Sequence, residues 1–361
     1  MRTLLTLLLL PWLMLGAPFP NNAGTSALAQ IGGISAYEFL NLPNSATVAA
    51  MGGHHIALLD DDLSLAWRNP ALLNPTMHRR AALSHAFFVD GISNSSLSYG
   101  HYLDNSKLTV QGGLQYTSYG GDLTRRDNTG QAQGTFSAND YALTVGAARQ
   151  FDDRLSLGVN LKVISSQLGG FNSFGLATDI AAHYRDTSGL FGITILARNA
   201  GVQLSKYDES SGREPLPFEL QIGINRELRY LPFRFSVIYR YLDRWNVLFE
   251  DPNATTEFSI LTTDEAITGR SAGSVFLDNL ARHFVFNGEL MIGKQRNFRV
   301  RFGYNHGLRR ELRLTDFRSL AGYSFGFAFR TRRFALAYGR GTYHLGGGVN
   351  QLGVDVFLGE R

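Results

Sequence analysis

The chain has 361 residues, with 34 Lys and Arg against 30 Asp and Glu, and 18% of its residues are charged, below the usual quarter. It contains no cysteine, which excludes a disulfide framework, a thiolate metal site and a cysteine nucleophile. A hydrophobic share of 44% argues against a bundle of membrane-spanning helices, and the interspersed basic residues argue against nucleic-acid binding.

The first 29 residues predict a signal peptide. Arg2 supplies the positive start, an apolar stretch covers residues 4–15, and Ala27-Leu28-Ala29 forms a small-residue cleavage site before Gln30. The apolar stretch is shorter than the roughly 20 residues that a spanning helix needs. We therefore expect an exported protein, and no later run of 18 apolar residues predicts a transmembrane helix.

Residues 30–79 predict a mixed segment with short helical turns. Asp62 is placed to cap a helix over 63–67, and Asn69-Pro70 is placed to start another with proline at its first position. The apolar content of this segment favours a plug folded into a barrel lumen over a loose periplasmic tail.

Residues 80–361 are dominated by strict alternation of apolar with polar or small residues, as in 155–163, which predicts β-strands. The apolar faces are long and aromatic at their ends, as with Tyr141, Tyr184, Tyr241 and Tyr304. These features, in an exported chain, favour an all-β fold: a 14-stranded transmembrane antiparallel β-barrel of the bacterial outer membrane with an N-terminal helical or irregular plug. A soluble β-sandwich is the alternative.

Fourteen strands are expected, with long loops near 117–139 and 245–282. The second loop carries a candidate helix over 275–281, and the final strand is expected to stop at Phe357. The expected strands start near residues 80, 94, 107, 140, 155, 174, 190, 217, 233, 283, 298, 320, 334 and 349.

The alternation also places ten charged side chains in the lumen. They form either the selectivity lining of a channel or a lattice of ion pairs in a plugged barrel, and the mixed signs favour the lattice. The inward charges are Lys162, Arg198, Arg234, Arg240, Arg299, Arg301, Asp179, Glu219, Glu289 and Asp355.

Catalytic motifs are missing from the sequence. His54-His55 are adjacent and diverge on any regular element, and Asp60-Asp61-Asp62 lacks the spacing and distal Glu of a calcium loop. There is no Gly-x-Ser-x-Gly elbow. We therefore expect a non-enzymatic protein with no cofactor and no metal site.

Seven short motifs are spread along most of the chain: GGISAYEFLNLPNSA at 32–46, AAMGG at 49–53, NPALL at 69–73, YGG at 119–121, GTFSANDY at 134–141, NAG at 199–201 and FLDNLARH at 276–283. In their order and spacing, these motifs resemble the PorQ family of the type IX secretion system of Bacteroidetes. The resemblance implies a FadL-like barrel, related to PorV, with an N-terminal plug. It also implies a place in the attachment complex, holding a PorZ-like surface protein beside PorU and PorV.

Three functions remain open. An anchor would use the loop at 245–282, where Trp245, Phe249, Phe258 and Phe276 are candidate partner-binding residues, unless they pack on the loop itself. The main alternative is a FadL-type transporter of hydrophobic compounds, and the third is a general porin. Of the 34 basic residues 30 are Arg, so outer-membrane lipid and lipopolysaccharide phosphates are further expected contacts, although genomic composition explains the same bias.

Overall fold

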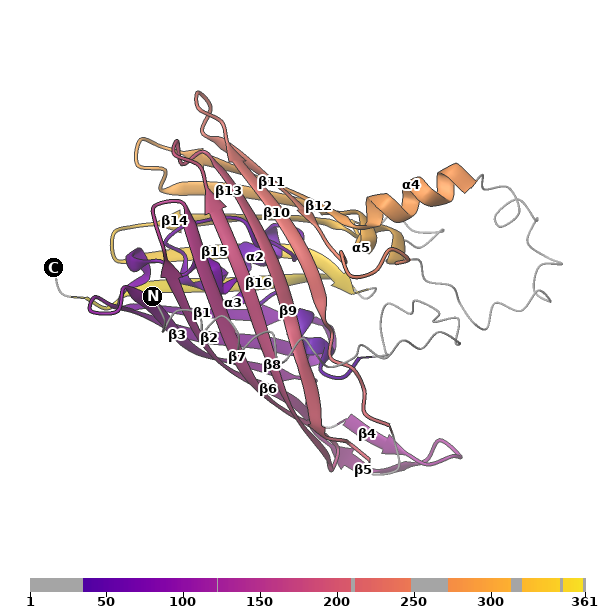
Figure 1. The fold of residues 1–361 in the computed structure, drawn as a ribbon. Coiled ribbons are helices and arrows are strands. Elements are labelled where there is room, and N and C mark those ends of the chain that lie inside the picture. The colour runs from indigo at the N-terminus through magenta and orange to yellow at the C-terminus, as the bar shows by residue number, and fades with distance from the viewer. Residues whose placement is uncertain are drawn as a thin grey trace, which may run out of the picture.

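The computed structural model describes residues 35–121, 123–208, 212–247, 272–312, 320–344 and 347–359. In these ranges, fourteen antiparallel strands close into one barrel, in which the first strand pairs with both the second and the last (Figure 1). This confirms the predicted all-β class, the strand number and the antiparallel barrel. The predicted signal peptide, residues 1–29, lies outside the described residues.

Every barrel strand begins within three residues of its predicted start. The barrel strands are β1 (Arg80–Phe87), β2 (Ser93–Leu103), β3 (Leu108–Ser118), β6 (Ala138–Gln150), β7 (Leu155–Leu168), β8 (Phe171–Arg185), β9 (Phe191–Ser205), β10 (Glu219–Glu227), β11 (Phe233–Tyr239), β12 (Phe284–Ile292), β13 (Phe298–Asn305), β14 (Tyr323–Arg330), β15 (Phe334–His344) and β16 (Gly347–Phe357). Closure is made by β1 and β16, whose register runs from Arg80 opposite Phe357 to Phe87 opposite Asn350.

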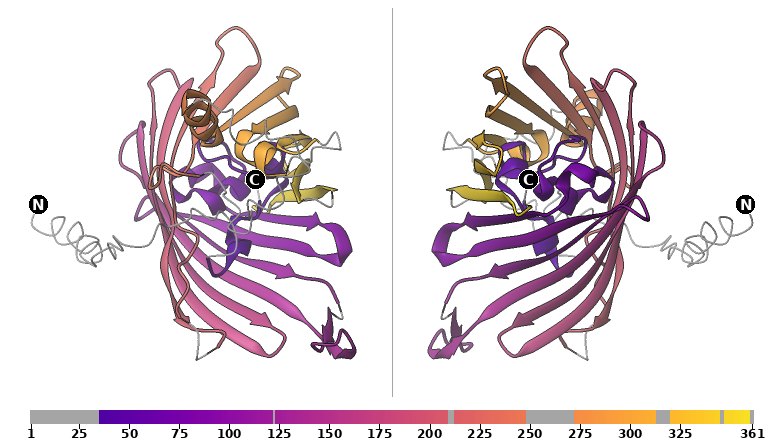
Figure 2. Two further views of the ribbon diagram at one scale, coloured as in Figure 1. Left: turned by 90° about the vertical axis from the view of Figure 1, so that its right-hand side faces the viewer. Right: turned by 90° about the vertical axis from the view of Figure 1, so that its left-hand side faces the viewer.

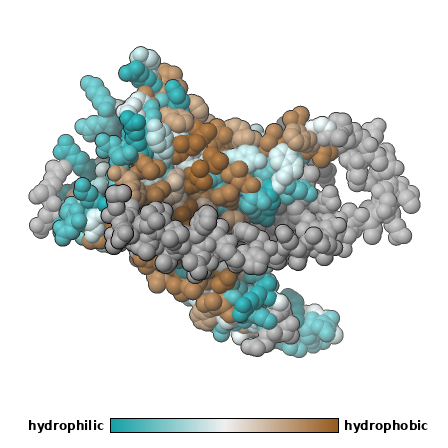
Figure 3. Space-filling view, in the orientation of Figure 1, coloured by the Kyte–Doolittle hydropathy of each residue, from teal (hydrophilic) through white to brown (hydrophobic). Residues whose placement is uncertain are grey.

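The two faces of each strand are inverted relative to a soluble protein. In β7, Asn160 and Lys162 are buried, whereas Leu161 between them is 62% exposed. On the face shown in Figure 3, exposed apolar side chains form a band across the middle of the barrel, with polar side chains toward its left-hand end. An apolar outer belt around a polar interior is the architecture of outer-membrane barrels. The sandwich alternative is therefore wrong.

The two ends of the barrel differ. Six short turns, at 104–107, 151–154, 186–190, 228–232, 293–297 and 331–333, lie together at the left in Figure 1 and form what we call the turn end. The opposite end, the loop end, carries the longer connections. Outer-membrane barrels keep their short turns on the periplasmic side and their longer loops on the outside.

The segment predicted as a loop at 117–139 is instead largely a β-hairpin. β3 runs to Ser118, β4 (Leu123–Arg126) pairs with β5 (Ala132–Phe136), and β6 begins at Ala138. The turn is made by Asp127, whose carboxylate accepts hydrogen bonds from the backbone of Thr129 and Gln131, and by Gly130 at φ 82°. This local turn chemistry lets a polar, Gly-rich segment pair with itself.

Helices are few and short. At the loop end, α4 (Ala272–Arg282) extends beyond the predicted 275–281 and lies beside α5 (His306–Glu311), whereas most of the loop at 245–282 lies outside the described residues. A single turn, η4 (Val89–Gly91), joins β1 to β2. Within the described ranges, no helix combines the length and apolarity needed to cross a membrane.

Residues 35–78 fill the lumen (Figure 2). This segment, called the plug below, contains η1 (Glu38–Asn41), α2 (Ala46–Ala50), α3 (Leu63–Arg68), η2 (Pro70–Leu72) and η3 (Pro75–Met77). Its apolar side chains pack in small clusters with inward residues of the wall, for example Ile56 with Leu196 and Ile238. The plug therefore shares its core with the barrel.

Candidate functional site

The plug is a chain of capped single turns, as the sequence predicts in part. Asp62 accepts a hydrogen bond from Ser64 N and caps α3, and Asn69 caps η2 with Pro70 at its first position. Ser45 and Asn74 cap α2 and η3 in the same way. Side-chain caps satisfy backbone donors that such short elements leave free, so the plug holds a defined shape without long helices.

At several glycines of the wall, which we call glycine seats, the plug approaches so closely that an added Cβ would overlap plug atoms. A Cβ at Gly158 would overlap the backbone of Pro70, and one at Gly339 would overlap the carbonyl of Ala46. Gly303 meets the backbone of Gly52 in the same manner. Five further inward glycines also have plug atoms within overlap distance, namely Gly100, Gly113, Gly175, Gly223 and Gly326. Seats on strands all around the barrel leave the plug no room to rotate.

Inward polar side chains of the wall donate to carbonyl oxygens of the plug. Asn160 donates to Trp67 O at 3.1 Å, Gln111 to Ala66 O at 3.0 Å and Gln115 to Phe39 O at 3.1 Å. Similar bonds run from Asn94 and Gln351 to Pro43 O, from Ser96 to Asn44 O, and from Ser324 to Ala50 O. Many polar side chains of the lumen therefore serve as hydrogen-bond donors to the plug backbone, since buried carbonyl groups need donors.

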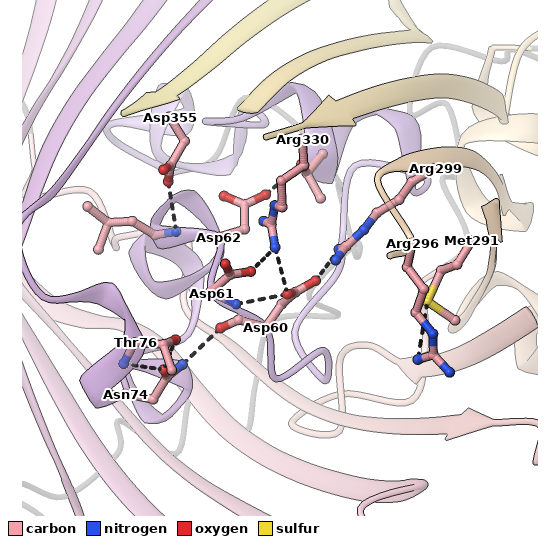
Figure 4. Close-up of polar contacts among 12 residues, drawn as sticks. Asp60, Asp61, Asp62, Asn74, Thr76, Met291, Arg296, Arg299, Arg330 and Asp355 are labelled. Carbon is pink, nitrogen blue, oxygen red and sulfur yellow. Dashed lines mark hydrogen bonds and ion pairs between the residues drawn. The ribbon is translucent and has the colours of Figure 1, made fainter. Parts of the chain in front are cut away.

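The main electrostatic contact is the Asp60 cluster, which we define as Asp60, Asp61, Asp62, Glu289 and Asp355 with Arg80, Arg234, Arg299, Arg301 and Arg330. Figure 4 shows its centre, where Arg299 and Arg330 point toward Asp60. Asp60 lies between arginines of three strands: Arg234 at 3.0 Å, Arg330 at 3.3 Å and Arg299 in contact. Burial alone would raise the pKa of the Asp60 carboxyl, but the three guanidinium groups outweigh it and hold that pKa well below its usual range. Asp60 is therefore ionised.

The rest of the Asp60 cluster extends this contact to both sides. Glu289 accepts from Arg301 at 2.8 Å and from Arg234, while Arg301 also donates to Thr47 of α2 at 3.0 Å. On the other side, Arg80 bridges Asp61 and Asp355, each at 2.9 Å. Five acids face five arginines, so the cluster is electrically balanced, as a buried network requires.

A second group, the Arg68 cluster, is not balanced. It comprises Arg68, Lys162, Arg198 and Arg240 with the carboxylates of Asp179 and Glu219, all of them buried. Lys162 pairs with Asp179 at 2.7 Å and Arg240 with Glu219 at 2.6 Å. Four cations thus share two carboxylates, and the Nε and Nη1 atoms of Arg68 and the Nε atom of Arg198 have no hydrogen-bond partner among the described residues.

Arg68 and Arg198 of this cluster also contact neutral groups of the plug. Arg68 Nη2 lies 2.7 Å from His54 Nδ1, and Arg198 donates to Leu40 O and, at 3.3 Å, to Asn41 Oδ1. Burial, together with the charges of Arg240, Arg68 and Arg198, holds the pKa of His54 well below its usual range. His54 is therefore a neutral acceptor for Arg68.

All ten charges predicted to face inward are buried in the lumen, and the expectation of an ion-pair lattice in a plugged barrel is confirmed. Four further members of this lattice were not predicted from the sequence: Asp60 and Asp61 of the plug, and Arg80 and Arg330 of the wall. Their pairing could have been predicted from the three consecutive carboxylates at 60–62, because they occur in a segment expected to lie among inward-facing arginines.

The free space that remains beside the plug is small. A cavity of about 30 Å³ lies between α2 and the wall, lined by Thr47, Asp62, Ala82, Ala337 and Gly353 among others. An engineered cavity that binds benzene measures about 150 Å³. The lumen of this structure therefore has no room at this position for a substrate of that size.

Of the predicted partner-binding residues, two are described. Trp245 and Phe276 contact each other at the base of α4, with ring centroids 5.1 Å apart, and Trp245 also stacks on His283. Both rings remain about half exposed, at 46% and 53%. Phe249 and Phe258 lie outside the described residues. Trp245 and Phe276 thus pack on each other, as the alternative expects, and still expose an apolar face to solvent.

The fold and the lumen define a class: a membrane-spanning, plugged β-barrel of the outer-membrane type. No protein-family model and no curated protein matches the chain. Among solved structures, the chain is similar to the Pseudomonas putida toluene transporter TodX, with 12% identity over 87% of this chain and 97% of that one, at a TM-score of 0.48. A Pseudomonas aeruginosa FadL homologue gives 8% identity over 88% and 98%, also at 0.48. Likenesses at this level assign neither a family nor an activity.

Proposed function

We propose that this protein is a non-enzymatic outer-membrane anchor whose barrel stays closed and whose loop end holds a surface protein. The observation that carries this proposal is the seating of the plug in wall glycines together with the balanced Asp60 cluster. A transporter must open a path through its lumen, whereas an anchor gains from rigidity. Here movement of the plug would expose several buried charges at once, which is costly.

The partner surface in this proposal is the loop end. α4 presents Val275, Phe276 and Leu277 to solvent beside Trp245, and the β4–β5 hairpin projects from the opposite side of the same end (Figure 1). Exposed aromatic and aliphatic side chains with a polar rim are typical of protein-binding sites. The PorQ-like sequence words supply the finer proposal, that the partner is a PorZ-like protein of the type IX attachment complex, with PorU and PorV nearby.

The anchor is tested by purification from outer membranes in mild detergent, followed by mass spectrometry of bound proteins. We expect a stoichiometric surface protein with the intact chain, and its loss when Trp245 and Phe276 are both replaced by Ser. The matched control replaces Leu336 and Phe334 of the lipid-facing wall, which are similarly exposed, by Ala. Retention of the partner by the double Ser variant would contradict the assignment of this surface.

The second candidate is a FadL-type transporter of hydrophobic compounds. It is favoured by one observation: the cavity beside α2 is lined by Ala82, Ala328, Ala335 and Ala337, and it adjoins the membrane-facing Leu83. TodX is itself named as a toluene transporter. Faster uptake of toluene into vesicles that contain the protein than into empty vesicles would support this candidate and contradict the closed-barrel proposal.

A further inference from the structure

Exposed basic side chains form a ring around the turn end. Every one of the six short turns or its flanking strand ends contributes at least one, and the residue before β1 contributes another. The ring consists of Arg79, Lys107, Arg149, Arg154, Arg185, Arg226, Arg229, Lys294, Arg296, Arg332 and Arg333. Of the acids that the structure describes at this end, three are exposed beside these eleven cations, namely Asp104, Asp152 and Asp153.

The ring is largely without internal counter-charges. Arg296 pairs with Glu227 at 2.6 Å, and no other ring cation has an ion pair to an acid among the described residues. At the loop end, by contrast, the described residues include four exposed cations and five exposed acids. The cations there are Arg125, Arg126, Arg213 and Arg244, and the acids are Asp90, Asp208, Glu214, Asp243 and Glu311. Among the described residues, the excess of exposed positive charge therefore lies at the turn end.

The position of the ring identifies what it meets. Arg149 and Arg226 lie on the outward face of their strands, Arg149 after Ala147 and the lipid-facing Val145, and Arg226 directly after the lipid-facing Ile224. Arg149 also lies over the ring of Phe151, with its guanidinium carbon 5.6 Å from the ring centroid. Long basic side chains at the edge of an apolar band extend to the headgroup level of a membrane. A protein partner would contact one side of the barrel, whereas these cations surround it.

We propose that the turn-end ring binds the anionic headgroups of phospholipids in the inner leaflet of the outer membrane. The guanidinium groups would pair with headgroup phosphates, for which arginine is well suited. The ring would fix the height of the barrel in the membrane, and this role is independent of what the loop end binds. It also places the phosphate contact at the end opposite to the lipopolysaccharide leaflet.

The test compares two fourfold variants of the full-length protein in neutral detergent. One variant carries Arg79→Gln, Arg229→Gln, Arg332→Gln and Arg333→Gln, and the matched control carries Arg125→Gln, Arg126→Gln, Arg213→Gln and Arg244→Gln. Native mass spectrometry counts bound phosphatidylglycerol and phosphatidylcholine. Since all eight side chains are exposed, both variants should keep the heat-modifiable gel mobility of a folded barrel.

The intact protein should retain phosphatidylglycerol over phosphatidylcholine, and the affinity for phosphatidylglycerol should fall about tenfold or more in the ring variant, since basic side chains near an anionic surface attract it. The control should bind as the intact protein does, and equimolar inorganic phosphate should not displace the lipid. Equal retention of both lipids by the intact protein would overturn the proposal. Equal losses in the two variants, or stronger binding of lipopolysaccharide to the ring than to the loop end, would also overturn it.

Discussion

The Asp60 cluster and the Arg68 cluster lie in one lumen and both combine buried cations with carboxylates, yet their charges are neutralised to different degrees. In the first, five acids meet five arginines, and three of the arginines converge on one plug carboxylate. In the second, four cations share two carboxylates, and Arg68 relies on a neutral histidine. The comparison teaches that the plug is fixed at the Asp60 cluster, whereas the Arg68 cluster contributes packing and carries uncompensated positive charge.

Replacing Asp60 by Asn should have the largest effect, because it leaves Arg234, Arg299 and Arg330 facing each other without their shared carboxylate. Breaking a buried charge network by removing one partner costs about 3–5 kcal/mol. Urea titration of the barrel in detergent micelles measures the free energy of unfolding. Asp61→Asn is the control, with a smaller loss expected, because Asp61 is more exposed at 24% of its side chain. Equal losses for the two would contradict the central place of Asp60.

Replacing Gly158 by Ala should lower the free energy of unfolding by about 1–3 kcal/mol, because the added methyl group overlaps the backbone of Pro70 in the plug. Gly112→Ala is the matched control, since no atom lies within 4 Å of the new methyl group. The same urea titration compares them. If both variants unfold alike, the plug does not depend on glycine seats.

The pH dependence should come from the plug histidines rather than from Asp60. Burial and the charge of Arg234 lower the pKa of His55 to about 3. Glu289 raises this pKa and Arg301 lowers it, so these two smaller effects oppose each other. The unfolded chain takes up a proton near pH 6.5 and the folded one does not, so stability falls as pH drops below 6.5, by about 2 kcal/mol at pH 5. Asp60 has a depressed pKa, so its contribution is complete above about pH 4 and is lost progressively as the pH falls further.

The measurement is the free energy of unfolding at pH 7.5 and pH 5 for the intact protein and for His55→Gln. The difference between the two pH values should shrink by about 2 kcal/mol in the variant. His101→Gln, at a half-buried position of the wall, serves as the control. An unchanged pH profile in His55→Gln would show that His55 is not buried in its neutral form.

Replacing Arg68 by Met should have the smallest effect, within about 1 kcal/mol of the intact protein and in the stabilising direction, since it removes an uncompensated buried charge. Arg301→Met, which deprives Glu289 of a 2.8 Å partner, should destabilise the barrel instead. Thermal unfolding in detergent ranks the two variants. A larger loss for Arg68→Met would mean that the Arg68 cluster fixes the plug.

The strands, their inward faces and the helix caps follow from local patterns in the sequence. Alternation at 155–163 identifies both the strand and its inward face, and it therefore predicts Lys162 in the lumen before its pairing with Asp179 is known. The caps at Asp62 and Asn69 are equally local. Each of these features depends on residues a few positions apart.

Long-range matches could not be predicted in this way. Asp60 meets arginines 174, 239 and 270 residues away, and no local pattern specifies which of several inward arginines a plug carboxylate will reach. The glycine seats have the same origin, because a small residue on an inward face is informative only once the opposing plug backbone is placed. The hairpin at β4–β5 was missed for a different reason: its polar strands lack an apolar face, and side-chain turn chemistry decides the outcome.

The closed lumen is tested most directly by conductance of the purified protein in planar lipid bilayers. The structure predicts no stable open channel for the intact chain, because the plug occupies the lumen and is fixed to strands all around it. Removal of residues 35–78 should give large, steady openings as the positive control for insertion. Steady openings of the intact protein, equal to those without the plug, would contradict a fixed plug and with it the closed-barrel anchor.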